Sequence, residues 1–290
     1  MTVHQTLSPR LHDLGGGFVV RRLLPSAQRQ SVGPFVFFDH FGPVTAQPGD
    51  QHDVRPHPHI GLSTVTYLFE GAMQHRDSTG AVLRMEPGQL NWMTAGRGIV
   101  HSERTPDDLR DKTRVAHGLQ LWMALPAAHE ECEPGFYPFG PADIPKREQA
   151  GVHIAVLAGT AFGATSPAPA RSPTLYLDVQ LQAGAALSLP ADYPERALYP
   201  LDAGCSLDGV TLQPHHMHLL GTGSTPLLQA SQAARVMVVG GEPLGHRFIA
   251  WNFVSSRKER ILQAREDWMA QRFPGIDGET EFIPYPADRA

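Results

Sequence analysis

Two short segments of the chain carry side chains that could bind a metal ion. They are His57-Pro58-His59 and His101-Ser102-Glu103, and each places two ligand-type residues at positions i and i+2. Residues two apart in a β-strand point to the same face of the sheet. If the two segments are neighbouring strands that line a small barrel, three imidazoles and one carboxylate converge in its interior.

Three neutral nitrogens and a carboxylate form a donor set that suits Fe(II), Mn, Co, Ni, Cu or Zn. Such a set leaves one or two coordination positions for water or substrate. A single His-x-His pair more often occurs by chance at the surface or in the core than as a pair of metal ligands. Only the two pairs together therefore indicate a metal site. Another cluster, His215, His216 and His218, follows Pro214 at the start of an apolar run. A turn and an alternating strand account for that cluster.

The elements expected to position these residues are β-strands. Short apolar runs rich in β-branched and aromatic residues recur between Gly, Pro, Asn and Asp, as in 35–38, 62–69, 152–157, 175–181 and 236–239. The stretch from Ile60 to Val100 contains a strand, a turn and a strand, enough to return the second pair beside the first. Residues 255–273 are the exception, because their apolar side chains fall at helical spacing. We therefore predict an all-β fold with one C-terminal helix.

Composition and charge argue against several other classes of protein. The 290 residues carry a formal net charge of −5 and no run of Lys or Arg, unlike a nucleic-acid-binding surface. No apolar run approaches the ~18–20 residues of a membrane span, and residues 1–17 lack a signal-peptide pattern. Cys132 and Cys205 form no CxxC pair, so neither a disulfide framework nor a thiolate zinc site is expected. We expect a cytoplasmic monomer without a membrane or direct nucleic-acid partner.

Longer stretches around the two segments resemble the cupin superfamily and, more narrowly, the pirin family. His57-x-His59 with Glu70-Gly71 resembles the first cupin motif, and Pro87-Gly88 with His101 looks like the second. Several stretches are similar to pirin motifs, namely 32–35, 38–43, 64–67, 75–77, 92–103, 118–122 and 240–244. The block 92–103, WMTAGRGIVHSE, is the most specific of these. The resemblance spans nearly the whole chain.

The resemblance implies a bicupin, that is, two antiparallel β-barrels of the double-stranded β-helix or jelly-roll type in one chain. An N-terminal metal-binding barrel would cover residues 1–135, and a metal-free C-terminal barrel would cover 136–290, with a helix at 256–272 and a tail. Carried over residue by residue, the metal ligands are His57, His59, His101 and Glu103. Many pirins carry Arg, Phe and Glu where this chain has Ile60, Leu62 and Ser63. Glu103 is then the only carboxylate that the motifs leave, and the surroundings of the site are less charged.

Bacterial pirin-like proteins are associated with quercetin 2,3-dioxygenase activity, so the resemblance implies a metal-dependent dioxygenase. Such an enzyme opens a flavonol such as quercetin with O2 and releases CO. It would use one mononuclear divalent transition metal, with Fe(II) favoured and Ni, Co, Mn, Cu or Zn as alternatives. Glu103 would be the catalytic residue and would take the proton of the substrate hydroxyl. Candidates for an apolar wall are Phe37, Phe38, Leu62 and Met93.

The alternative reading is a metal-binding, redox-responsive regulatory protein that acts through a protein partner. A family-like charged patch around the site would support that role. This chain has Ile60 and Ser63 where the patch would need Arg and Glu. The difference favours the enzyme.

Overall fold

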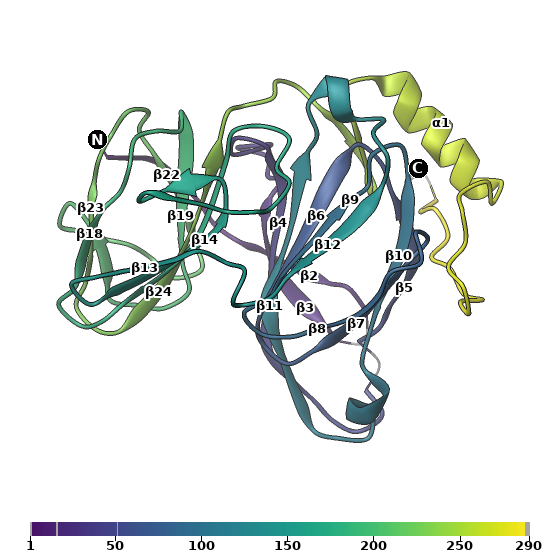
Figure 1. Cartoon of the computed structure of the whole chain (residues 1–290), viewed down its shortest axis with the longest axis horizontal. Coiled ribbons are helices and arrows are strands. Elements are labelled where there is room, and N and C mark those ends of the chain that lie inside the picture. The colour runs from purple at the N-terminus through teal and green to yellow at the C-terminus, as the bar shows by residue number, and fades with distance from the viewer. Residues whose placement is uncertain (1, 16, 51, 288–290) are drawn as a thin grey trace. The chain divides into compact units, whose positions relative to one another are not determined.

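The computed structural model describes residues 2–15, 17–50 and 52–287, and most of its regular structure is β-strand (Figure 1). The chain forms two units, each assembled from segments that are far apart in sequence. Unit 1 comprises Met1–Leu11, Arg21–Asp39 and Phe139–Pro243, and unit 2 comprises His12–Val20, His40–Pro138 and Leu244–Ala290. The predicted all-β architecture with one C-terminal helix is confirmed. The division of the sequence into domains 1–135 and 136–290 stays a prediction.

Two sheets matter for the candidate site. The smaller lies wholly in unit 2, whereas the larger includes strands that are divided between the two units. The larger sheet follows the order β12 (Gly135–Phe139), β9 (Leu90–Thr94), β6 (Leu62–Glu70), β11 (Arg114–Ala124), β4 (Phe35–Ala46), β3 (Val19–Leu24) and β2 (Arg10–Asp13). The smaller follows the order β5 (Val54–His59), β10 (Ile99–Arg104), β7 (Met73–Asp77) and β8 (Val82–Met85). Phe41 of β4, Leu68 of β6 and Met85 of β8 belong to one buried cluster, so apolar side chains of both sheets pack together. Two short 3-10 helices, Asp107–Leu109 and Ala127–His129, lie in the loops.

Strand β10 lies between the two other strands of the smaller sheet that carry histidines, β5 and β7. It pairs antiparallel with β5, with His101 opposite His57, and with β7, with Glu103 opposite His75. The prediction that the two ligand-bearing segments are neighbouring strands is therefore confirmed. Beyond His101 the register shifts, because Glu103 lies opposite Val54. Strand β5 thus has one extra residue at this point, which is a β-bulge.

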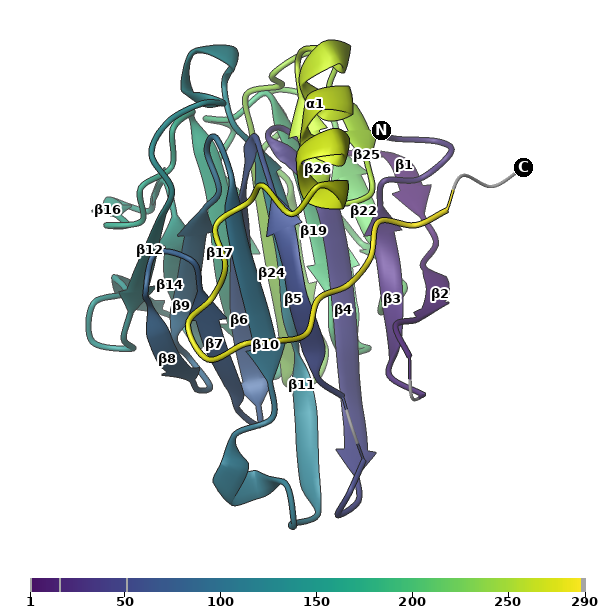
Figure 2. The same cartoon turned by 90° about the vertical axis from the view of Figure 1, so that its right-hand side faces the viewer.

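The C-terminal segment packs on unit 2. It forms β25 (Phe248–Ala250), β26 (Phe253–Ser255) and α1 (Lys258–Met269), within the predicted range 256–272. Figure 2 shows α1 and the chain after it passing in front of β10 and β5. The backbone N–H of Ile283 donates to the carbonyl of Pro56 at 2.8 Å. One buried cluster joins the layers, made of Ile60, Val100, Phe253, Ile261, Ala264, Trp268 and Ile276.

A buried acid anchors the start of this segment. Glu130 accepts hydrogen bonds from the Ser255 hydroxyl and the Ser256 backbone N–H, both at 2.8 Å, and pairs with Arg247.

Among the described residues no helix has the length and apolar character that crossing a membrane requires.

Unit 1 is built from thirteen further strands around an apolar core. Its larger sheet follows the order β1 (Val3–Leu7), β22 (Met217–Leu220), β19 (Glu195–Pro200), β24 (Ala234–Gly241), β17 (Thr174–Leu181), β14 (Val152–Ala158) and β13 (Lys146–Gln149). A second sheet follows the order β18 (Ala186–Ser188), β23 (Leu227–Ala230), β20 (Cys205–Leu207) and β21 (Val210–Thr211), and β15 (Thr160–Ala161) pairs with β16 (Ala164–Thr165). Its core consists largely of Leu, Val, Ile and Ala side chains.

Candidate metal centre

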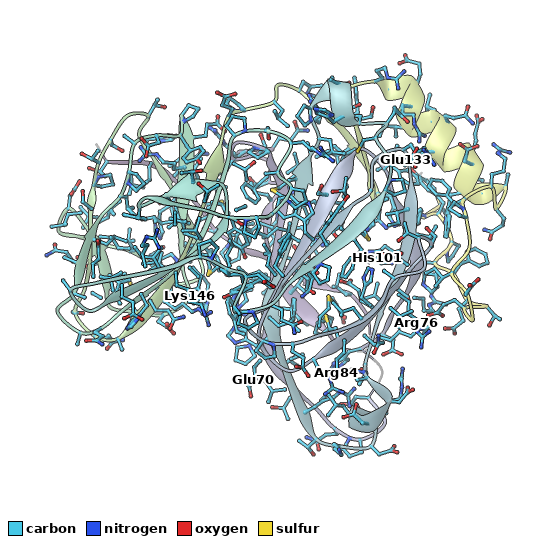
Figure 3. The ribbon with its side chains drawn as sticks, in the orientation of Figure 1. Glu70, Arg76, Arg84, His101, Glu133 and Lys146 are labelled. Atoms are coloured by element: carbon cyan, nitrogen blue, oxygen red, sulfur yellow. The ribbon has the colours of Figure 1, made fainter. Side chains whose placement is uncertain are left out.

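Three buried histidines converge inside unit 2. His57 and His59 come from β5 and His101 from β10, and one ring nitrogen of each lies within 4.8 Å of the others. The three residues are at most 6% exposed. Figure 3 shows His101 in the interior of the unit, whereas the exposed Glu133 lies at its surface. The same-face argument from sequence therefore brings the three imidazoles together.

Two of the three rings are oriented by backbone carbonyls. His57 Nδ1 lies 2.8 Å from the carbonyl oxygen of Arg55, and His59 Nδ1 lies 3.2 Å from that of Asn252. A carbonyl only accepts, so Nδ1 must carry the proton in both rings, and Nε2 is left with a lone pair. The carbonyl of Arg55 belongs to the bulged part of β5, and Asn252 belongs to the C-terminal segment.

His101 has no such partner. Within the described part of the chain, neither of its ring nitrogens makes a hydrogen bond, although both are buried. Its ring centroid lies 4.3 Å from that of His57 and 5.1 Å from that of His59. A buried nitrogen without a partner costs free energy unless something else satisfies it. A divalent cation between the three rings would do so.

Burial keeps these imidazoles neutral. Loss of hydration lowers the pKa of His57 from 6.5 to about 4, with the neighbouring His75 adding to the effect. The pKa values of His59 and His101 are lowered as well, first by burial and then by the other rings. Neutral imidazole is the form that binds a metal, so the protein holds its donors ready at neutral pH.

The metal-free protein should lose stability as the pH falls from about 6.5 towards 4. In the unfolded chain these histidines bind protons near their ordinary pKa of 6.5, whereas folded His57 does so only near 4. The unfolded state thus binds more protons in this window, and His57 alone would lower the free energy of unfolding by about 3 kcal/mol. Urea unfolding of the metal-free protein at pH 7.5, 6 and 5 measures the slope. A slope that His57→Gln leaves unchanged would contradict this assignment.

Glu103 lies beside the three histidines but outside their group. It follows His101 on β10, is partly buried, and its carboxylate is not among the atoms within 4.8 Å of one another. Burial raises the pKa of its carboxyl, and the nearby His75 and the Thr66 hydroxyl oppose this. The carboxyl is therefore a better proton acceptor near neutral pH than an exposed glutamate. Its role as a fourth ligand stays a prediction.

A histidine and aspartate pair lies next to Glu103. His75, opposite Glu103 on β7, places its Nε2 2.9 Å from a carboxylate oxygen of Asp77, and both are buried. The His75 ring stacks on Phe136 with centroids 4.1 Å apart and lies 5.4 Å from the His101 ring. Asp77 and Phe136 together fix the orientation of His75.

The donor set fits one divalent transition metal. Three neutral imidazole nitrogens with a carboxylate nearby suit Fe(II), Mn, Co, Ni, Cu or Zn and leave coordination positions open. The contacts that orient the donors did not follow from the motifs. They include the carbonyl of Asn252 and the ring of Trp122, which meets that of His59 edge to face at 5.1 Å. Pairs so distant in sequence leave no local signal.

The residues expected to form an apolar wall fall into two groups. Leu62 and Met93 are buried in unit 2, on strands of the larger sheet. Phe37 and Phe38 belong to unit 1, where Phe37 lies under Arg22 and Phe38 packs on Tyr199. Strand β4 passes from one unit to the other after Asp39, and the role of these four residues as an apolar wall stays a prediction. Ile60 and Ser63 are each only 1% exposed.

The second histidine cluster is held by hydrogen bonds of its own. Both ring nitrogens of His218 have partners, the Thr6 hydroxyl at 3.2 Å and the carbonyl of Gln213 at 3.0 Å. His216 Nδ1 lies 2.9 Å from the carbonyl of Pro214. Among the described residues, this cluster does not form a group of convergent ligand atoms.

Comparison with known proteins identifies relatives along the whole chain. The family model of pirin matches residues 17–123, and that of the pirin C-terminal cupin domain matches residues 176–274. A pirin-like protein of Caulobacter vibrioides is 48% identical over 282 residues, which cover 96% of this chain and 97% of that protein. A Pseudomonas aeruginosa protein named "Putative quercetin 2,3-dioxygenase PA1205" is 40% identical, over 91% of this chain and 83% of its own.

A solved structure shares the fold. The crystal structure of a quercetin 2,3-dioxygenase from Acinetobacter baumannii superposes with a TM-score of 0.89 and 34% identity, over 99% of this chain and 96% of that one. The two-part cupin fold expected from the sequence is thereby confirmed.

Proposed function

The chain belongs to the pirin family, and we propose that it is a metal-dependent dioxygenase that opens a flavonol such as quercetin with O2 and releases CO. Relatives of the quercetin 2,3-dioxygenase type, one of 40% identity and one solved structure, support this reaction class. The substrate and O2 are the small-molecule partners of the proposal. The metal is one divalent transition ion, and Fe(II) is the one we favour.

The observation that carries the proposal is the state of the three imidazoles. Two are fixed with their Nε2 lone pairs available, and the third, His101, has two buried nitrogens that find no partner among the described residues. A core histidine that only filled space would have its ring nitrogens satisfied. His57, His59 and His101 would hold the ion, and Glu103, two residues after His101 on β10, would act beside it.

The bound metal would supply a Lewis acid for the substrate hydroxyl oxygen and one-electron chemistry with O2. The chain itself has two tasks. The carbonyls of Arg55 and Asn252 hold the His57 and His59 rings in one tautomer, and the buried surroundings exclude bulk water. The carboxylate of Glu103 accepts the proton that the flavonol hydroxyl loses, helped by the raised pKa of this carboxyl.

Reconstitution tests the reaction directly. The protein is loaded separately with Fe(II), Ni(II), Co(II), Mn(II) or Cu(II), and quercetin loss in air is followed together with CO. We expect metal-dependent loss of quercetin with release of CO, because the donor set leaves coordination positions for substrate. Tight binding of metal with no turnover by any of these ions would contradict the quercetinase assignment and favour the regulatory alternative or another substrate.

A further inference from the structure

A cavity of about 450 Å³ opens in unit 2 at the end of β5 and β10. It is lined by residues of these strands, of three loops and of the C-terminal segment, among them His52, Asp53, Arg55, Arg104, Arg110 and Glu281. Its size lies in the range of small-molecule pockets, ~300–1,000 Å³. The proposed reaction gives no role to this cavity.

The cavity adjoins the proposed proton acceptor. A smaller space of about 30 Å³ is lined by Glu103, and it shares Phe18, His52 and Arg104 with the larger cavity. This volume holds about one water molecule, so an aromatic substrate does not fit there without movement of its walls. The larger cavity, in contrast, has room for a flavonol-sized ring system.

One of the three arginines lining the cavity lacks a counter-charge. Arg104 binds Glu279 with Nε and Nη2 at 2.9 and 2.5 Å and also Glu281 at 2.8 Å. Arg110 pairs with Asp53 at 3.0 Å. The guanidinium of the exposed Arg55 makes no ion pair or hydrogen bond within the described residues. The acids Asp53 and Glu281 that also line the cavity are engaged by the other two arginines. The guanidinium of Arg55, two residues before His57, is therefore the cation available to a ligand in the cavity.

Aromatic rings lie at the junction of the two spaces. Phe18 and His52 stack with centroids 5.1 Å apart and an interplanar angle of 24°. Phe18 is buried and also contacts Phe41, whereas His52 is half-buried and has a buried Nδ1 without a hydrogen-bond partner. A planar ligand can stack on such a ring.

We propose that this cavity is a docking site for a planar aromatic anion of the phenolate class, with Arg55 binding its charged oxygen and His52 its ring. The site would collect the substrate beside Glu103 before the ring reaches the histidines. The proposal deepens the proposed dioxygenase function and rests on it for the identity of the ligand. Binding and turnover can nevertheless be measured separately.

Equilibrium binding to the zinc-loaded full-length protein, without O2, tests the docking site. The probes are quercetin, which is an acidic flavonol, and flavone, which has no hydroxyl group. Arg55→Ala should raise the Kd of quercetin about tenfold, because a charge-assisted contact is lost, and should leave that of flavone within twofold. Arg55→Lys should recover part of the affinity. His52→Ala should weaken both probes, because the ring face is lost.

Arg171→Ala is the matched control, since Arg171 is an exposed arginine of unit 1 and its loss changes the net charge equally. A Kd for quercetin within twofold of wild type in Arg55→Ala would overturn the docking site, and so would an equal loss in Arg171→Ala. Turnover decides the other question. If wild type binds quercetin through Arg55 but does not turn it over, the proposed reaction is refuted and the docking site stands. If wild type turns quercetin over but Arg55→Ala leaves its Kd unchanged, the docking site is refuted and the reaction stands.

Discussion

His101→Ala is expected to remove bound metal and to abolish turnover. The substitution takes away one of three imidazoles whose ring nitrogens converge within 4.8 Å. It removes the ring whose nitrogens have no hydrogen-bond partner in the part of the chain that the structure describes. Two histidines and a carboxylate outside the group leave a much weaker site. After dialysis against a low concentration of chelator, we expect the metal content to fall below about a tenth of wild type, consistent with losing a direct ligand.

The same variant should stay folded, which separates loss of the site from loss of the protein. Without a metal, the buried His101 ring makes no hydrogen bond to any residue that the structure describes, so replacing it with Ala removes an unfavourable burial along with some packing. We expect the thermal midpoint of the metal-free variant to lie within a few degrees of metal-free wild type.

His216→Ala is the control, because that ring contacts the carbonyl of Pro214 in unit 1 and should affect neither metal nor activity. Full metal content in His101→Ala would refute the assigned centre.

Glu103→Gln should reduce turnover strongly while costing less metal than His101→Ala. The amide keeps the shape of the side chain but cannot take a proton, and loss of a positioned general base lowers rates by about 10²- to 10⁴-fold. Because the carboxylate lies outside the three-histidine group, its loss should lower metal affinity to a smaller degree. Metal analysis and kcat for quercetin, both measured on the same preparation, give the two effects.

A pH profile sharpens the second test. If Glu103 accepts the proton, the acidic limb of kcat/KM should follow a carboxyl pKa above its ordinary value, since burial raises it. Glu103→Gln should remove that limb from the residual activity. Glu133→Gln is the control, because Glu133 is an exposed acid whose partner is Arg97. Unaltered kcat in Glu103→Gln would show that another group takes the proton.

Features of the site and the fold that depend on the residue pattern within one segment could be predicted from the sequence. Alternation along a strand predicts that His57 and His59 share a face, and the antiparallel return of β10 places His101 opposite His57. Helical spacing also located α1 to within a few residues. Both inferences depend on the spacing of residues along one strand or one helix, which can be read within a single segment.

Features set by distant contacts could not be predicted in this way. A bulge in β5 shifts the register of its pairing with β10 between positions His101 and Glu103. The residue types at 54–59 do not predict this bulge. The carbonyl that orients His59 comes from Asn252, 193 positions along the chain. Unit membership likewise follows tertiary contacts, so that Phe38 and His40 belong to different units although one residue separates them.

The contribution of Asn252 imposes an order on biosynthesis. A ribosome completes the strands that carry all three histidines before it adds the segment after residue 244, whose backbone fixes the His59 tautomer and whose side chains pack on Ile60 and Val100. A nascent chain halted before that segment would present its imidazoles without this restraint. If the three histidines bind an ion, its capture by imidazoles held in the right tautomer would wait for the segment after residue 244, and the strands synthesised earlier would compete for metal less well alone.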